Sequence, residues 1–314
     1  MGGRDLSFLA GPDAVVDWRK VVLVDAADRA GILAALPDGA AGVAGRLGLD
    51  ETAVRVVLDA LGAWDVVVAG DDGRYALGPG APEGSDGDVL NHHARAIRNW
   101  AGSLDDRLRG VPAVEGAPMP DPERWMSALA AGARAEAPMV VERCLGAAPG
   151  ARTVLDLGGG HGEYALEFAR RGLRATMQDR ETMVELARRR KTLEAAGVEL
   201  FAGDFFETLP DGVFDLVFCS GVTHTFGGDR VATLFRRAAG LVAPGGHLAV
   251  QTFLRARHPV ASLFAVQMMA NGRGGDTHSE EEYRRWLHDA GFAPPEVVDL
   301  DGGRRSLLVS PLGG

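Results

Sequence analysis

The 314-residue sequence predicts an α/β fold, in which a doubly wound, mostly parallel sheet follows a smaller helical region. From residue 153 onward, short apolar runs alternate with amphipathic segments, as is typical of a parallel sheet covered by helices on both faces. A glycine-dense turn follows the first of these runs, and Asp179 ends the second. Ligands of such sheets bind at the carboxyl ends of the strands, so we expect the functional residues in the loops there.

The elements of this second half can be placed from their apolar periodicity. Strands are expected at 153–157, 173–178, 198–202, 214–219, 247–253, 296–300 and 306–310. Helices are expected near 162–171, 181–196, 229–242 and 280–290. This alternation predicts that residues 149–314 form one domain that carries the main site.

The N-terminal region predicts a winged-helix pattern. A helix is expected over about 14–36, a second helix over 54–61 with Asp50 as its N-cap, and a hairpin over 66–77. The presumed recognition helix carries Arg55 as its one base among three acidic residues, which argues against a DNA-binding regulator. We therefore expect residues 1–88 to form a dimerisation domain, and the protein to be a homodimer.

Residues 89–148 predict a helical connector between these two domains. Helical segments are expected at 89–108 and 122–145, on either side of a proline-rich break. The family resemblance given below implies that this connector lines the substrate pocket.

Composition limits the function classes. Hydrophobic residues make up 46% of the chain and charged residues 24%, which is ordinary for a soluble globular protein. The formal net charge of −10 argues against a general partner for nucleic acids or anionic membranes. The start of the chain lacks a signal-peptide core, and the two cysteines lie in apolar surroundings. We expect a cytoplasmic protein whose partner is a small-molecule substrate.

The glycine turn predicts a nucleotide-like ligand. Gly158, Gly160 and Gly162 lack a Cβ, which allows unusual dihedral angles and close approach of a ligand to the backbone. Asp179, at the tip of the second strand, can hydrogen-bond ribose hydroxyls. A nicotinamide dinucleotide site would place its third glycine at position 163, where this chain has Glu163. A nicotinamide-dependent oxidoreductase is therefore the less favoured interpretation.

The Asp-x-Gly-x-Gly-x-Gly pattern that starts at Asp156 resembles motif I of the class I S-adenosylmethionine-dependent methyltransferases. Nearly the whole chain resembles the winged-helix dimerising O-methyltransferases that include plant phenolic and bacterial polyketide enzymes. This resemblance implies a Rossmann-like fold and S-adenosyl-L-methionine as cofactor. It also implies contacts with the methionine part, the ribose and the adenine, at Asp156, Gly158, Gly160, Asp179, Arg180, Asp204, Phe205 and Ser220.

The resemblance implies a catalytic residue as well. His224 follows the fourth strand, where this family has the general base that deprotonates a phenol. Two acids usually orient that base, but the matching positions here hold Gln251 or Thr252, and Thr277. A histidine without a carboxylate behind it has less to fix its tautomer or stabilise its charged form.

His278 stands beside one of these lost acids, and two imidazoles that face one pocket can hold Fe or Zn. The pair resembles the metal-dependent C-methyltransferases that act on 2-oxo acids. In that interpretation His224 and His278 are metal ligands, and Arg107 or Arg109 pairs with the substrate carboxylate.

Two reactions therefore remain open. We first expect metal-assisted C-methylation at the β-carbon of an arylpyruvate-like 2-oxo acid, since a metal would stabilise the enolate. The alternative is O-methylation of a phenol or hydroxyl in natural-product biosynthesis, with His224 as general base. The segment after His278 has the Ser-x-x-Glu pattern of a capping box, so this residue also fits a position ahead of a helix.

Overall fold

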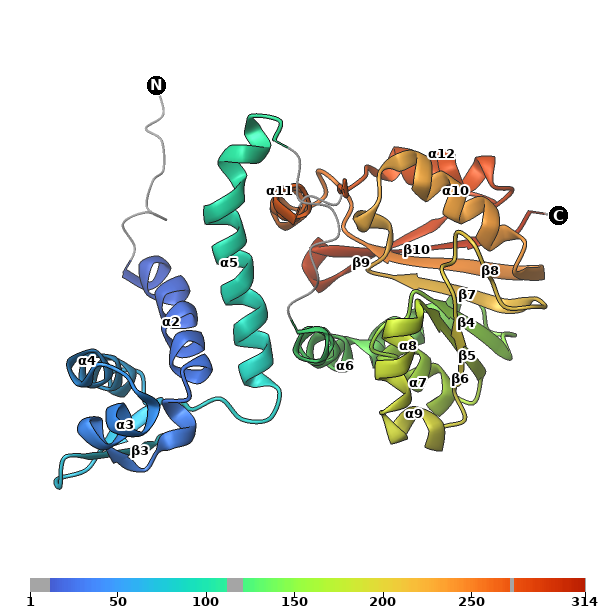
Figure 1. The fold of residues 1–314 in the computed structure, drawn as a ribbon. Coiled ribbons are helices and arrows are strands. Elements are labelled where there is room, and N and C mark those ends of the chain that lie inside the picture. The colour runs from blue at the N-terminus through green and yellow to red at the C-terminus, as the bar shows by residue number, and fades with distance from the viewer. Residues whose placement is uncertain (1–11, 112–120, 272–273, 314) are drawn as a thin grey trace. The chain divides into compact units, whose positions relative to one another are not determined.

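The computed structural model describes residues 12–111, 121–271 and 274–313 (Figure 1). The chain divides into two compact units, Met1–Arg98 and Asn99–Gly314. The division into three parts at residues 88 and 148 stays a prediction. None of the described helices is long and apolar enough to cross a membrane.

The first unit contains short helices beside a small sheet. Its strands are β1 (Asp38–Gly39), β2 (Val67–Ala69) and β3 (Arg74–Leu77), in the antiparallel order β1-β3-β2. Its helices are α2 (Pro12–Arg29), η1 (Leu33–Ala35), α3 (Ala40–Leu47), α4 (Glu51–Gly62) and the first part of α5 (Asp86–Leu108). Asp50 caps α4 by accepting a hydrogen bond from the Ala53 N–H at 2.8 Å. The second predicted helix and the hairpin are thus present, whereas the helix expected over 14–36 ends at Arg29 and is followed by the short η1.

The second unit is built on a seven-stranded sheet with the order β6-β5-β4-β7-β8-β10-β9. The first five strands in this order are parallel, whereas β10 is antiparallel to both of its neighbours. The strands are β4 (Thr153–Leu157), β5 (Arg174–Asp179), β6 (Glu199–Ala202), β7 (Phe214–Ser220), β8 (Val242–Thr252), β9 (Glu296–Leu300) and β10 (Arg305–Pro311). The predicted doubly wound α/β fold is confirmed.

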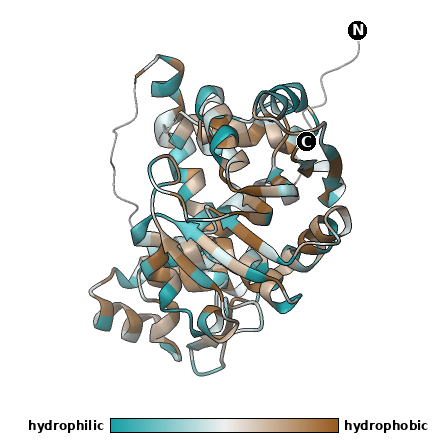
Figure 2. Cartoon of the chain, turned by 90° about the vertical axis from the view of Figure 1, so that its right-hand side faces the viewer, coloured by the Kyte–Doolittle hydropathy of each residue, from teal (hydrophilic) through white to brown (hydrophobic). Residues whose placement is uncertain are grey.

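Helices cover this sheet (Figures 1 and 2). The helices of this unit that follow α5 are α6 (Pro122–Ala147), α7 (Glu163–Arg170), α8 (Glu181–Arg188), α9 (Lys191–Ala195), α10 (Gly228–Ala239), α11 (Pro259–Asn271) and α12 (Glu280–Asp289), with short turns at η2 (Thr223–Thr225) and η3 (Asp301–Gly303). One apolar cluster joins α6 and α7 to the sheet, and a second joins α10 and α12 to it. Each face of the sheet is therefore buried under its own helices.

Two elements differ from the sequence-based expectation. The helix expected at 181–196 is two helices, α8 and α9, that are separated at Arg189 and Arg190. The sequence pattern does not predict α11. Pro259–Asn271 contains no Asp, Glu, Lys or Arg, so no charged face marks it as an amphipathic helix. The strand order changes direction between β4 and β7, so the carboxyl ends of these two strands mark the place where a ligand is expected.

Candidate active site

The glycine turn begins where β4 ends. Gly158, Gly160 and Gly162 have φ angles of +75°, +48° and +72°, in the left-handed region that favours glycine. A Cβ on Gly158 would lie 2.6 Å from Cγ2 of Val222, which leaves no room for a side chain. The turn therefore needs glycine both for its conformation and for its close packing.

Asp179 lies at the tip of β5, beside this turn. Its Oδ2 accepts a hydrogen bond from the Gly160 N–H at 2.9 Å, and its Oδ1 accepts one from the Arg180 N–H at 2.7 Å. Burial raises the pKa of Asp179 against these two hydrogen bonds. The carboxylate thus fixes the turn and stands where a ribose-binding acid is predicted. The Arg180 side chain is exposed.

Asp156 lies behind the turn rather than on its open side. It is 1% exposed, and its Oδ2 accepts a hydrogen bond from the Ala165 N–H of α7 at 3.2 Å. Burial raises its pKa to about 7. The contacts of Asp156 therefore hold the glycine turn against the start of α7, which is a supporting role.

An aromatic group flanks the other side of the turn. A Cβ on Gly158 would lie 3.6 Å from the Phe205 ring, and that ring packs on Phe206 and Phe226 with centroids 4.9 and 5.9 Å away. Asp204 accepts a hydrogen bond from the Phe206 N–H at 2.8 Å, which fixes this loop. The arrangement places a flat apolar surface beside the turn, as the adenine of the cofactor requires.

Ser220 ends β7, next to β4 in the sheet. Its hydroxyl donates a hydrogen bond to Oε1 of Gln251 on β8 at 2.7 Å. The glycine turn, Asp179, Phe205 and Ser220 thus gather at one edge of the sheet. Glycines without a Cβ, a carboxylate from Asp179 and an aromatic ring from Phe205 together fit S-adenosylmethionine.

His224 lies in η2, directly after β7. It is 8% exposed, and its ring meets the ring of Phe264 from α11 edge-on, with centroids 4.7 Å apart. Phe264 in turn stacks on Phe253 at 4.1 Å. Burial, with a smaller contribution from His278, lowers the pKa of His224 to about 4, so the imidazole is neutral near pH 7.

Three buried hydroxyl groups hold the turn that carries His224. Thr223 lies 2.6 Å from the Tyr283 hydroxyl and 3.1 Å from that of Thr252, and Thr252 and Tyr283 are 3.0 Å apart. These three residues, here called the hydroxyl ring, join η2 to the end of β8 and to α12. Nothing in the sequence pattern marked Thr223 or Tyr283.

No carboxylate takes the place of the two missing acids. Nδ1 of His224 is buried and has no hydrogen-bond partner among the described residues. Asp276, next to Thr277 along the chain, pairs with Arg255 and accepts a hydrogen bond from the Thr277 N–H. Glu282 forms the α12 capping box with Ser279 and also pairs with Arg255. The structure therefore agrees with the sequence that His224 lacks a supporting acid.

His278 is buried at 3% exposure on the segment before α12. Its Nε2 lies 3.0 Å from the carbonyl oxygen of Phe226, and its ring packs edge-on against Trp286 at 4.9 Å. A nitrogen that donates a proton to a carbonyl oxygen has no lone pair for a metal. Within residues 12–111, 121–271 and 274–313, no group of three His, Cys, Asp or Glu side chains is arranged to hold a metal ion. The predicted Fe or Zn site therefore does not fit this geometry.

The two arginines predicted to bind a substrate carboxylate lie at the end of α5. Arg107 donates a hydrogen bond to the carbonyl oxygen of Val111, and Arg109 is exposed and 3.7 Å from Asp105. These partners lie within four residues along the chain. Neither arginine has a described contact with His224, so their predicted role gains no support.

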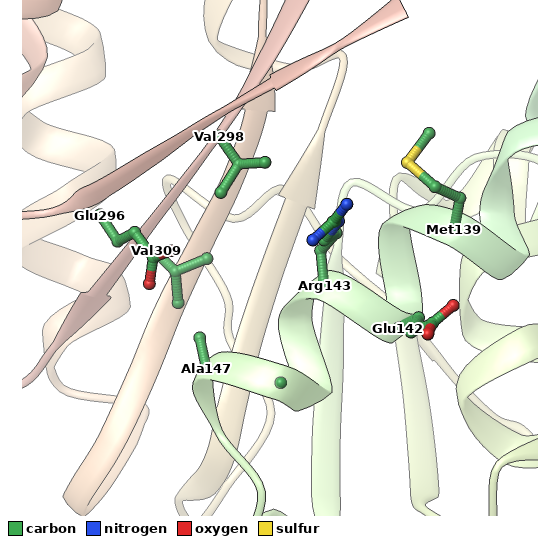
Figure 3. A pocket seen from close by; sticks show the side chains of 8 residues that line it. Met139, Glu142, Arg143, Ala147, Glu296, Val298 and Val309 are labelled. Carbon is green, nitrogen blue, oxygen red and sulfur yellow. The ribbon is translucent and has the colours of Figure 1, made fainter.

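A hollow of about 410 Å³ opens between α6, β9 and β10 (Figure 3). Arg143 and Met139 of α6 face Val298 across it. None of its eight lining residues belongs to the glycine turn, η2 or α12, so the hollow is separate from the candidate active site.

Comparison with known proteins identifies the family. Residues 124–297 match the family described as a methyltransferase domain. The chain is 37% identical over 161 residues to a mitomycin biosynthesis 6-O-methyltransferase of Streptomyces lavendulae, covering 49% of this chain and 45% of that protein. It is 29% identical over 330 residues to a 3-amino-4-hydroxybenzoate 4-O-methyltransferase of Streptomyces cremeus, covering 95% and 87%.

Solved structures agree. An O-methyltransferase family protein from Burkholderia thailandensis is 25% identical, with a TM-score of 0.79 and coverage of 99% of this chain and 98% of that one. Human N-acetylserotonin methyltransferase in complex with S-adenosylmethionine shares the fold, with a TM-score of 0.79, 21% identity and full coverage of both chains. Together with the glycine turn and Asp179, these matches show that the chain belongs to the methyltransferase-domain family and is an S-adenosylmethionine-dependent methyltransferase.

Proposed function

We propose that this protein transfers a methyl group to a hydroxyl oxygen of a small aromatic natural product, with His224 as the group that faces the acceptor. The observation that carries this proposal is the position of His224. It lies on the turn after β7, at the same sheet edge as the glycine turn, against the stacked rings of Phe253 and Phe264. A flat acceptor that packs on these rings would bring its hydroxyl to the imidazole.

The cofactor site proposed for this reaction follows the geometry described above. The backbone of the glycine turn would hold the methionine part, Asp179 would bind the ribose, and Phe205 would pack on the adenine. Ser220 and Asp204 support the same loops. These assignments are tested by substituting each residue and measuring how tightly the protein binds S-adenosylhomocysteine, which we expect to be weakened.

The proposed chemistry is a direct displacement. When bound, S-adenosylmethionine supplies an electrophilic methyl group, and the carbon–sulfur electron pair returns to sulfur as the oxygen–carbon bond forms. The rings of Phe253 and Phe264 beside His224 would exclude water and orient the acceptor, and this alignment with the methyl group would lower the barrier to transfer. A neutral His224 can accept the hydrogen bond or the proton of the acceptor hydroxyl.

The relatives support an oxygen acceptor over a carbon acceptor. Two are described as acting on the aromatic acids 3-amino-4-hydroxybenzoate and 3-hydroxy-5-methyl-1-naphthoate, each at oxygen. The metal-assisted C-methylation of a 2-oxo acid lacks comparable support, because Nε2 of His278 is engaged by Phe226. O-methylation is therefore the better supported of the two reactions.

We also propose that the first unit mediates a homodimer. Its apolar side chains Val56, Val68 and Leu77 are 53%, 48% and 53% exposed, which suits a contact surface. Analytical ultracentrifugation would show a dimer for the native protein and a monomer after Val56→Glu. A native monomer at micromolar concentration would exclude the proposal.

The reaction is tested with methyl-labelled S-adenosylmethionine and a set of hydroxynaphthalenes and hydroxybenzoates, with phenylpyruvate as the 2-oxo acid control. We expect the label in an aryl methyl ether, identified by NMR, and no effect of a strong chelator. Methylation of phenylpyruvate at carbon, abolished by the chelator, would restore the metal-assisted reaction instead.

A further inference from the structure

Three buried polar atoms around the active-site turn have no hydrogen-bond partner in the described part of the chain. They are Nδ1 of His224, Nε2 of Gln251 and Oγ1 of Thr277, and the three residues are 8%, 2% and 0% exposed. Buried polar groups in native proteins are nearly always paired, with protein, water or a ligand. The three atoms therefore indicate a polar occupant.

These atoms come from three segments that converge on η2. Gln251, the last residue but one of β8, pairs with Ser220 in the sheet register, and its backbone carbonyl accepts a hydrogen bond from the Gly221 N–H. The segment before α12 runs along the same turn, because a Cβ on Gly275 would collide with the His224 carbonyl. His278 contacts the carbonyl oxygen of Phe226 on that turn. The occupant would thus lie where the methyl acceptor is proposed to bind.

The two carboxylates described beside this turn are both paired with the same guanidinium group. Asp276 and Glu282, on the segment before α12 and on α12 itself, each lie 3.3 Å from Nη2 of Arg255. α11 carries no charged side chain, and the Tyr283 hydroxyl of α12 is held in the hydroxyl ring. His278 faces the turn with its Nε2 on the Phe226 carbonyl. An anion at His224 would therefore meet an amide and a hydroxyl as donors and no unpaired carboxylate among these groups.

We propose that the acceptor hydroxyl is an acidic phenol or enol, conjugated with a carbonyl group, which is methylated as an oxyanion that forms before the transfer, while Thr277 and Gln251 donate hydrogen bonds to its oxygens. This inference rests on the proposed O-methylation and specifies its substrate class. The oxyanion supplies the electron pair of the new oxygen–carbon bond, and the carbon–sulfur pair goes to sulfur. The hydroxyl proton has already been lost to solvent, so the enzyme need not store it.

The physical reason is the lack of a counter-charge for a protonated His224. If His224 took the proton of an ordinary phenol, a buried imidazolium would form with no carboxylate beside it, which is unfavourable in a low dielectric. The lowered pKa of His224, about 4, agrees with this. An acceptor that is already ionised avoids that state and is attracted by the sulfonium charge of the cofactor.

The test uses the full-length enzyme and two acceptors of similar shape, 2-hydroxy-1,4-naphthoquinone as the acidic hydroxyl and 2-naphthol as the ordinary phenol. We expect kcat/KM for the quinone to exceed that for naphthol by about 100-fold at pH 7, in line with the fraction of each that is ionised. Across pH 4 to 10, the midpoint of the profile should follow the pKa of each acceptor.

A common midpoint for both acceptors, or a preference for naphthol, would overturn the substrate class while leaving O-methylation intact. Transfer to neither acceptor nor to the hydroxybenzoates would overturn the proposed function and this inference together. The two failures are therefore distinguishable.

Thr277→Val tests the donors. We expect about tenfold lower kcat/KM for the quinone, unchanged affinity for S-adenosylhomocysteine, and recovery in Thr277→Ser. Ser310→Ala is the matched control, because Ser310 is also a buried, unpaired hydroxyl but pairs with Leu248 in the middle of the sheet, away from η2. Equal kcat/KM in wild type and Thr277→Val would mean that Thr277 binds only water and would overturn its assignment.

Discussion

The Nε2 atom of His278 lies 3.0 Å from the carbonyl oxygen of Phe226, two residues after His224. The imidazole of His278 thus ties the segment before α12 to the turn that carries the other histidine. Sequence alone groups the two histidines as metal ligands, but in the fold His224 packs against Phe264 and His278 holds the turn that carries His224.

His278→Ala should therefore reduce stability more than it reduces catalysis by a folded enzyme. We expect a loss of about 1–3 kcal/mol in the free energy of unfolding, because the Phe226 carbonyl loses its partner and the Trp286 ring loses its packing. Urea unfolding measures this. His288→Ala, which changes an exposed histidine of α12, is the control and should unfold like wild type. Chelator-sensitive activity in the native protein would contradict this role.

His224→Gln should separate the two kinds of acceptor. For an ordinary phenol we expect a loss of about 100-fold or more in kcat, the usual contribution of a general base. For an acidic hydroxyl the loss should be less than about tenfold, because its proton has already left. The affinity for S-adenosylhomocysteine, measured by calorimetry, should not change. Equal losses for both acceptors would argue that His224 acts on each in the same way.

The lowered pKa of His224 also predicts acid sensitivity. Burial depresses the folded-state pKa to about 4, below the value of about 6.5 in the unfolded chain, so the unfolded state binds more protons between these values. The free energy of unfolding should therefore have its full value above pH 6.5 and should fall by up to about 3 kcal/mol as the pH drops to 4. Desolvation also lowers the pKa of His161, which is half-buried, to about 4, and this residue adds to the slope. Thermal unfolding of His224→Gln between pH 7 and 4.5 should be less dependent on pH than that of wild type.

Asp179→Asn should weaken the cofactor site. The carboxylate accepts hydrogen bonds from the N–H groups of Gly160 and Arg180, and it is the predicted ribose ligand. We expect about 10- to 100-fold weaker binding of S-adenosylhomocysteine by calorimetry. Asp215→Asn is the matched control. Asp215 likewise accepts backbone hydrogen bonds, from Arg152 and Thr153, but at the opposite edge of the sheet, so its loss should lower stability and leave affinity unchanged.

Phe264→Ala should open the apolar wall of the pocket. Phe264 contacts both His224 and Phe253, so its removal takes away the surface on which a flat acceptor is proposed to pack. We expect a KM for an aromatic acceptor that rises about tenfold or more, with unchanged affinity for S-adenosylhomocysteine. Leu263→Ala, an exposed neighbour on α11, is the control. An unchanged KM in Phe264→Ala would place the acceptor elsewhere.

Local features of the sequence sufficed for the cofactor side of the site. Left-handed φ angles at Gly158 and Gly162 and an acid at the end of the next strand are dictated within a single β-turn-α-β unit, so spacing alone predicts them. Asp156 shows the limit of this reasoning. Its place in the pattern was recognised, but its contact with the Ala165 N–H behind the turn depends on how α7 packs.

The acceptor side depends on contacts between distant segments. Phe264, on α11, reaches His224 forty residues earlier in the chain, and no periodic pattern encodes that approach. The partner of His278 is a backbone carbonyl, which every residue possesses, so a sequence contains no sign of it. The sequence shows directly that positions 251 and 277 hold Gln251 and Thr277 rather than acids. Only the fold shows that their polar side-chain atoms are buried without a hydrogen-bond partner.

The hydroxyl ring of Thr223, Thr252 and Tyr283 has one further consequence for the turn above it. Each hydroxyl gives one hydrogen and can take one, so three donors meet three acceptors, and the hydrogens can point around the ring in either sense without moving a heavy atom. The turn that carries His224 is thus held by an anchor that has no net charge. The position of this turn should therefore be the same in dilute and in concentrated salt. An anchor built from a carboxylate and a cation would instead loosen in concentrated salt.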